Sequence, residues 1–156
     1  MKNIILAATL VAVSASQASA LSCIRPDVAT AFKDASDSDR NYVVLKGTFE
    51  FTPPAKTDKP QAETVDSQFR GRLLTGGGFT QTVSAPVEID MTCAGEWCAQ
   101  VDPNVEYIAF VENIDNERLI FEVGPCYGFA FKEPVQEAVK RLENCAQGGA
   151  CEPATE

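Results

Sequence analysis

The sequence of 156 residues has no histidine, and this absence excludes several common kinds of active site. Ser-His-Asp and Cys-His catalysis both need an imidazole as general base, and many zinc sites need it as a ligand. Carboxylates are available anywhere in a chain with 22 acidic residues, so their presence singles out no catalytic pair. The sequence therefore predicts a non-catalytic protein with no catalytic residues, no metal site and no cofactor.

Basic residues are scarce, with 13 Lys and Arg against 22 Asp and Glu and a formal net charge of −9. Such a surface repels the phosphates of nucleic acids and of anionic membranes. Arg70 and Arg72, with Lys46 on a neighbouring strand, make a small basic patch, but no aromatic residues alternate with them to stack bases. The acidic run Asp34–Asp39 lacks the Gly and the closing Glu of a calcium loop. We therefore expect no nucleic-acid partner and a solvated acidic loop.

The apolar run Ile4–Val13 is too short to span a bilayer and is typical of a signal peptide. Lys2 supplies the charged start, and Ala18-Ser19-Ala20 supplies a small-residue cleavage site. We therefore expect residues 1–20 to be a signal peptide and Leu21 to begin the mature chain. Lys2 is the only charge removed, so the mature net charge is −10.

A mature chain of this length suits one domain with a modest core. We expect that domain at residues 21–151, followed by a disordered tail at residues 152–156. Export to the periplasm or to the outside of the cell follows from the signal peptide, and the short signal is typical of a bacterium.

All six cysteines follow the expected signal peptide, and an even number in an exported chain indicates three disulfides. Fifteen pairings are possible from the sequence alone. Structural zinc is disfavoured because four and five residues separate the two close pairs, and no Cys-x-x-Cys motif suggests redox catalysis. The cysteines are Cys23, Cys93, Cys98, Cys126, Cys145 and Cys151.

Cys23 raises the alternative of a lipid anchor, because bacterial lipoproteins are acylated on a cysteine soon after the apolar run. Such sites usually have Leu three positions before the cysteine and Gly or Ala immediately before it. Here those positions hold Ala20 and Ser22, so the form without a lipid is favoured. We expect no membrane attachment unless Cys23 is acylated.

Hydrophobic periodicity predicts a mainly β domain with a helix near each end. Three runs alternate with a period of two, and two further strands flank a polar turn and are expected to form a hairpin. Five strands with one apolar face each, and a helix to cover the end, suggest a small closed or partly open barrel. Pro86 should lie at an edge or a bulge of its strand, because it has no N–H. The expected elements are a helix at Arg25–Ala35, strands at Tyr42–Phe51, Val65–Leu73, Phe79–Met91, Glu106–Val111 and Leu119–Val123, and a helix at Glu133–Cys145.

Several short motifs resemble the netrin-like module, whose best-known members are the tissue inhibitors of metalloproteinases. The resemblance covers most of the mature chain and implies a five-stranded barrel of the oligonucleotide/oligosaccharide-binding (OB) type. It also implies a short N-terminal helix, a C-terminal helix and stapling by disulfides. The motifs are Leu21-Ser22-Cys23, Pro26, Ala31-Phe32, Tyr42–Gly47, Cys98, Glu106–Phe110 and Cys126–Phe129.

The resemblance also implies a disulfide pairing. The family's cysteine at the third position pairs with the one matched by Cys126, which implies Cys23–Cys126. In the family, the first cysteine pairs with the one matched by Cys98. This chain has Leu21 in place of that first cysteine, so Cys93 becomes the expected partner of Cys98. The family's third bridge joins a cysteine just after Ala-Phe to the C-terminal segment. This chain has a lysine instead of that cysteine, so the two C-terminal cysteines are expected to pair with each other. That pair is Cys145–Cys151.

The inhibitors of this family chelate a protease zinc through the amino and carbonyl groups of their first residue. Leu21 has those groups but no disulfide of its own, so ordering it on binding would cost conformational entropy. An exported, non-catalytic binding module with a protein partner is therefore the favoured function. The alternative is a metalloproteinase inhibitor acting through Leu21, and an uncharacterised periplasmic enzyme is a third candidate.

The residues that could contact a partner are Leu21, Ser22 and Trp97. Trp97 is the only tryptophan and lies between Cys93 and Cys98. It could be an exposed contact or could pack over its own disulfide or the mouth of the barrel, and packing is the favoured interpretation. The apolar segment at residues 125–131 is likewise favoured as core.

Overall fold

The computed structural model describes residues 23, 26–55, 61–115 and 117–154. The expected signal peptide, Leu21, Ser22 and the last two residues of the expected tail lie outside these ranges. The described chain is mainly β, as predicted, and neither of its helices is long and apolar enough to cross a membrane. Its elements are α1 (Val28–Asp37), β1 (Tyr42–Glu50), β2 (Glu63–Thr75), β3 (Gly78–Met91), β4 (Cys93–Ala94), β5 (Trp97–Cys98), β6 (Glu106–Ile114), β7 (Arg118–Val123), β8 (Ala130–Lys132) and α2 (Gln136–Ala146).

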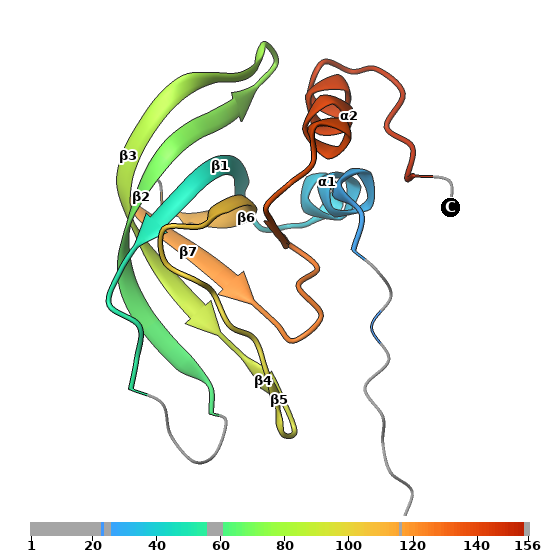
Figure 1. The fold of residues 1–156 in the computed structure, drawn as a ribbon. Helices are drawn as coiled ribbons and strands as arrows, with labels where there is room; N and C mark the ends of the chain where they lie inside the picture. The colour runs from blue at the N-terminus through green and yellow to red at the C-terminus, as the bar shows by residue number, and fades with distance from the viewer. Residues whose placement is uncertain (1–22, 24–25, 56–60, 116, 155–156) are drawn as a thin grey trace, which may run out of the picture.

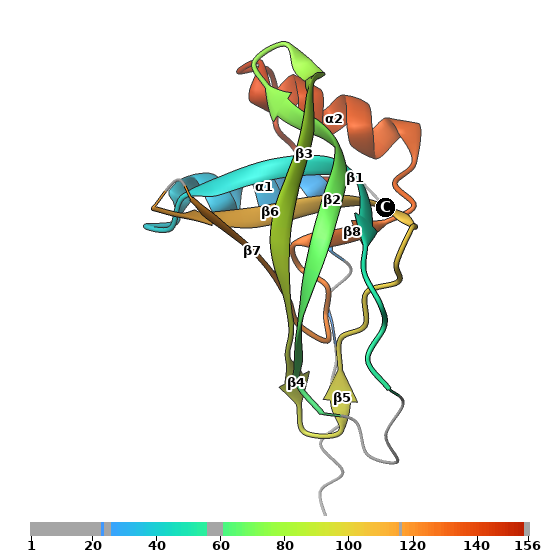
Figure 2. The same cartoon turned by 90° about the vertical axis from the view of Figure 1, so that its left-hand side faces the viewer.

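Five strands pair in a closed ring of order β1–β2–β3–β7–β6, because β6 also pairs with β1. The pairings are antiparallel except that of β3 with β7, which is parallel. β8 pairs with β6 along residues 107–109, and β4 and β5 form a separate hairpin. The strands curve round one side of the molecule, and α1 and α2 lie on the other (Figures 1 and 2).

β1 and β2 come unusually close where Gly47 faces Gly71. A Cβ atom on Gly47 would overlap the backbone of Arg70, and one on Gly71 would overlap the backbone of Lys46. Only residues without a side chain allow the two strands to approach this closely.

The edge position predicted for Pro86 is confirmed. Pro86 faces Gln68 of β2, whereas β7 pairs with β3 only over residues 88–91. The missing N–H of Pro86 therefore interrupts no ladder with β7.

Two apolar clusters lie on opposite sides of the strands. Inside the ring, Phe49 packs against Phe69 and Phe121, with ring centroids 5.1 and 5.0 Å apart. Outside it, α1 and α2 cover Ile108 and Phe110 of β6. β6 is thus buried on both faces, which corrects the prediction of one apolar face for this strand and explains why its sequence is continuously apolar rather than alternating.

The structure corrects both helix boundaries. α1 begins at Val28, because the Asp27 carboxylate accepts the backbone N–H groups of Ala29 (2.8 Å) and Thr30 (3.3 Å) as an N-cap. α2 begins at Gln136 rather than at Glu133. The left-handed backbone of Glu133 (φ 47°) is incompatible with a helix that starts there.

Candidate functional site

An exposed tryptophan marks one end of the ring. Cys93 and Cys98 face each other across the β4–β5 hairpin and form a disulfide, and Gly95 (φ 63°) provides the turn. Trp97 is 61% exposed, which agrees with the alternative of an exposed contact rather than with the favoured packed position over its own disulfide or the mouth of the barrel. The hairpin projects from the lower end of the strands in Figures 1 and 2.

A surface cavity of about 510 Å³ lies beside Trp97. The cavity lies between the hairpin and the N-terminal disulfide Cys23–Cys126, so residues far apart in the sequence line it together. Trp97 therefore lies next to the start of the described chain, whereas Leu21 and Ser22 lie outside it. The lining residues are Cys23, Glu96, Trp97, Cys98, Gln100, Pro125 and Tyr127.

The walls of this cavity are held by hydrogen bonds. The backbone N–H of Gln100 donates to the Tyr127 hydroxyl (3.0 Å), and both residues line the cavity. Two residues further along the chain, outside this lining, the backbone N–H of Asp102 donates to the Tyr107 hydroxyl (3.1 Å). Tyr127 has a left-handed backbone (φ 51°), and its N–H donates to the carbonyl of Gly124 (2.9 Å). A tyrosine in this conformation is strained, and such residues tend to cluster at functional sites.

A second cavity of about 570 Å³ shares Cys98 and Gln100 with the first. Residues of the loop after β1 and the start of β2 form one wall, and the end of β3 and the segment at residues 98–103 form the other. Most of the lining is apolar, with three prolines. The lining residues are Pro53, Pro54, Ala55, Gln61, Glu63, Met91, Cys98, Ala99, Gln100, Val101, Asp102 and Pro103.

Two groups near these cavities, Tyr107 and Lys132, have pKa values raised above their ordinary values. Burial raises the pKa of Tyr107, against the opposing effect of its hydrogen bond from Asp102. The hydrogen bond from Lys132 Nζ to Asp102 Oδ2 (2.9 Å) raises the pKa of Lys132. Neither group is thereby tuned to exchange protons near pH 7, as a general acid or base would be.

The structure brings the three predicted basic residues together but gives each of them a partner. Lys46 faces Arg72 across β1 and β2. Lys46 Nζ lies 2.8 Å from Glu106, Arg70 Nε lies 2.9 Å from Glu50, and Arg72 donates to the carbonyl of Phe79 (3.2 Å). The patch is therefore largely neutralised.

The predicted acidic run begins in α1, where Asp34 and Asp37 are exposed, and ends at exposed Asp39. Across the described ranges, no group of three Asp, Glu, Cys or His side chains is arranged to hold a metal ion.

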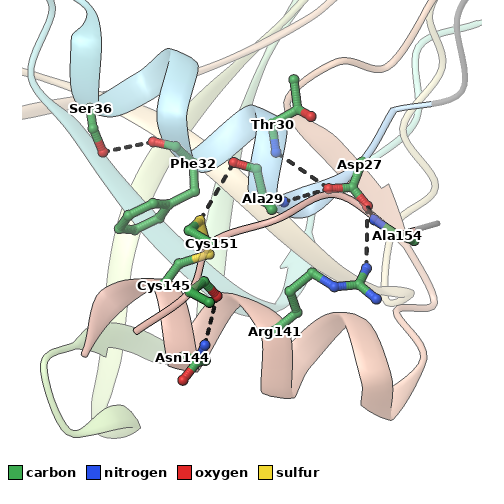
Figure 3. Close-up of a disulfide and its surroundings, with 11 residues drawn as sticks. Asp27, Ala29, Thr30, Phe32, Ser36, Arg141, Asn144, Cys145, Cys151 and Ala154 are labelled. Carbon is green, nitrogen blue, oxygen red and sulfur yellow. Dashed lines mark hydrogen bonds and ion pairs between the residues drawn. A yellow bond between two sulfur atoms is a disulfide. The ribbon is translucent and has the colours of Figure 1, made fainter. Parts of the chain in front are cut away.

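The three disulfides are Cys23–Cys126, Cys93–Cys98 and Cys145–Cys151, the pairs that the resemblance implies. They indicate an oxidising, exported environment. Figure 3 shows the third, which ties the residues after α2 to the helix; the Cys151 sulfur also lies 3.8 Å from the Ala29 carbonyl oxygen of α1.

The sequence prediction missed Glu96, Gln100 and Tyr127 as parts of one surface. One signal was available, because Gly95-Glu96 between Ala94 and Trp97 is typical of a two-residue hairpin turn. The meeting of this hairpin with the Tyr127 segment depends on tertiary packing alone. Tyr127 packs partly on the inner core and Phe131 on the outer one, so the segment at residues 125–131 is core in part, as expected.

Comparisons with known proteins find no family model, no curated protein and no solved structure that matches this chain.

Proposed function

We propose that this protein is an exported, non-catalytic binding module that docks a protein partner at the end of the ring bearing Trp97. The observation that carries the proposal is the 61% exposure of that tryptophan on a disulfide-closed hairpin. Tryptophan is enriched among the residues that dominate binding energy at protein interfaces. An exposed indole beside a cavity is therefore a suitable anchor for a partner.

The rigidity of this surface supports the same function. Cys93–Cys98 closes the hairpin, Cys23–Cys126 holds the neighbouring segment, and the Tyr127 hydroxyl fixes Gln100. Surfaces ordered before binding lose little conformational entropy when a partner docks.

We further propose that the ring is an OB-type barrel of the netrin-like kind. The five-strand ring, the helix at each end and the three disulfide pairs all agree with what the resemblance implies. OB folds often bind ligands with the loop between their first two strands. Here that loop contributes Pro53, Pro54 and Ala55 to the second cavity.

Affinity capture from the compartment in which the protein is found tests the docking surface. The Trp97→Ala variant should lose a partner that the wild-type protein retains. Val135→Ala is a matched control, because Val135 is the other large exposed apolar residue (64%) in the part of the chain that the structure describes, and it lies just before α2. A partner retained equally by Trp97→Ala would contradict the proposal.

Inhibition of a zinc protease through Leu21 is the second candidate. Cys23 lines the cavity beside Trp97, and Leu21 precedes Cys23 by two residues in the sequence. Mature protein that begins at Leu21 should be compared with the same protein carrying one extra N-terminal Ala. Nanomolar inhibition that the added Ala abolishes would establish this function in place of the first.

N-terminal sequencing of the secreted form tests the proposed processing. A free Leu21 agrees with cleavage after Ala20. Acylation of Cys23 would assign the protein to a membrane surface and would exclude the Cys23–Cys126 disulfide, because the lipid occupies the same sulfur.

A further inference from the structure

The cavity beside Trp97 combines aromatic walls with one charged group. Trp97 and Tyr127 provide aromatic rings, and Pro125 adds apolar surface. Among the described residues that line the cavity, Glu96 is the only charged one. A ligand that fits this lining needs an apolar stem and a cationic end.

The Glu96 carboxylate has no hydrogen bond or ion pair with any residue that the structure describes. Some surface carboxylates elsewhere are paired, as Glu50 is with Arg70 and Glu106 with Lys46, whereas others, such as Glu137, are like Glu96 unpaired within the described ranges but line neither cavity. The cavity thus offers an acceptor that the described chain leaves unused, on a protein with a net charge of −9. Charge complementarity favours a cationic occupant.

We propose that this cavity binds an arginine side chain presented by an extended segment of the protein partner. A planar guanidinium can stack on the Trp97 ring while it donates hydrogen bonds to the Glu96 carboxylate, and a lysine ammonium matches this combination less well. The adjoining second cavity, which shares Cys98 and Gln100, gives room for the flanking residues of the segment. The proposal rests on the proposed function and specifies the chemistry of its partner.

Trp97 is the only tryptophan of the chain, so its fluorescence reports directly on this cavity. The mature protein should be titrated with acetyl-Gly-Arg-Gly-amide and with matched peptides in which lysine or citrulline replaces arginine. We expect a saturable change with the arginine peptide, weaker binding of the lysine peptide and none of citrulline, which keeps the shape but not the charge. Spermidine and free arginine amide test whether a small cation suffices, and we expect both to bind more weakly than the peptide.

The variant Glu96→Gln should weaken binding of the arginine peptide about fivefold, the effect expected from losing one exposed ion pair. Glu137→Gln is the matched control, because Glu137 is an exposed glutamate on α2 outside both cavity linings. Equal binding of the citrulline peptide, equally tight binding of spermidine, or an unchanged affinity of Glu96→Gln would overturn the proposal.

Competition against a captured partner separates this inference from the function on which it rests. If Trp97→Ala loses the partner while Glu96→Gln and excess arginine peptide leave capture unchanged, the docking surface stands and the arginine proposal fails. If Trp97→Ala retains the partner, the docking surface itself is wrong.

Discussion

Asp27 is the residue on which the two ends of the described chain converge. Its carboxylate caps α1, accepts the backbone N–H of Ala154 (3.2 Å) and lies 3.3 Å from Arg141 of α2 (Figure 3). Burial raises the pKa of Asp27, but the backbone hydrogen bonds and the charge of Arg141 outweigh burial, so the pKa falls below its ordinary value of 3.8. The ionised form of Asp27 therefore stabilises the fold.

This shift predicts a pH dependence of stability. A carboxyl group with a lowered pKa stabilises the fold fully above pH 3.8, and that stability is lost as the pH falls through its folded-state pKa. The change Asp27→Asn should lower the free energy of unfolding at pH 7 by about 0.5–1.5 kcal/mol, because amides cap helices but carry no charge.

Urea unfolding between pH 2 and 7 checks this expectation. The difference between the wild type and Asp27→Asn should shrink below pH 4. Asp34→Asn, an exposed position of α1, serves as the control. A difference that stays constant over the whole pH range would show that charge on Asp27 contributes nothing.

At the scale of elements, the close contact of β1 and β2 depends on two glycines. The change Gly47→Ala should lower the free energy of unfolding by about 1–3 kcal/mol, because the new Cβ would overlap the backbone of Arg70 and force the strands apart. Gly76→Ala should stay within about 0.5 kcal/mol of the wild type, since a Cβ there meets nothing within 4 Å. Thermal and urea unfolding of the two variants measure these changes. Equal losses of unfolding free energy in Gly47→Ala and Gly76→Ala would show that the close approach of β1 and β2 does not affect stability.

The sequence predicted β2 and β3 because each buries one face and its residues therefore alternate, whereas β6, a continuous apolar run, was predicted as one strand of a hairpin around a polar turn. It missed β8, β4 and β5, which have only two or three residues each and are too short to show a period. β8 forms because β6 offers an edge at residues 107–109. The exposure of Trp97 was equally beyond prediction, because the pattern of one hairpin does not show what packs against its tip.

At the scale of the whole molecule, the disulfides differ in the length of chain that they close. Cys23 and Cys126 are 103 residues apart, whereas Cys145 and Cys151 are separated by only 6. In the chain-entropy model the long loop contributes about 4.7 kcal/mol and the short one about 2 kcal/mol. The N-terminal disulfide should therefore stabilise the fold most.

Replacing both cysteines of the N-terminal pair, and separately both cysteines of the C-terminal pair, by serine tests this order. The Cys23→Ser/Cys126→Ser protein should lose about twice the unfolding free energy lost by the Cys145→Ser/Cys151→Ser protein in urea without reductant. A larger loss from the C-terminal pair would show that its links to α1, rather than loop length, determine its contribution.

The closed ring also imposes an order on folding. The β2–β3 and β6–β7 hairpins join neighbouring segments, but the β1–β6 pairing joins residues 58 to 70 positions apart. Such non-local pairing is slow, because the chain must lose loop entropy before the contact forms. Until β1 meets β6 the sheet has two open edges that could pair with other chains, so ring closure is the step at which folding competes with aggregation.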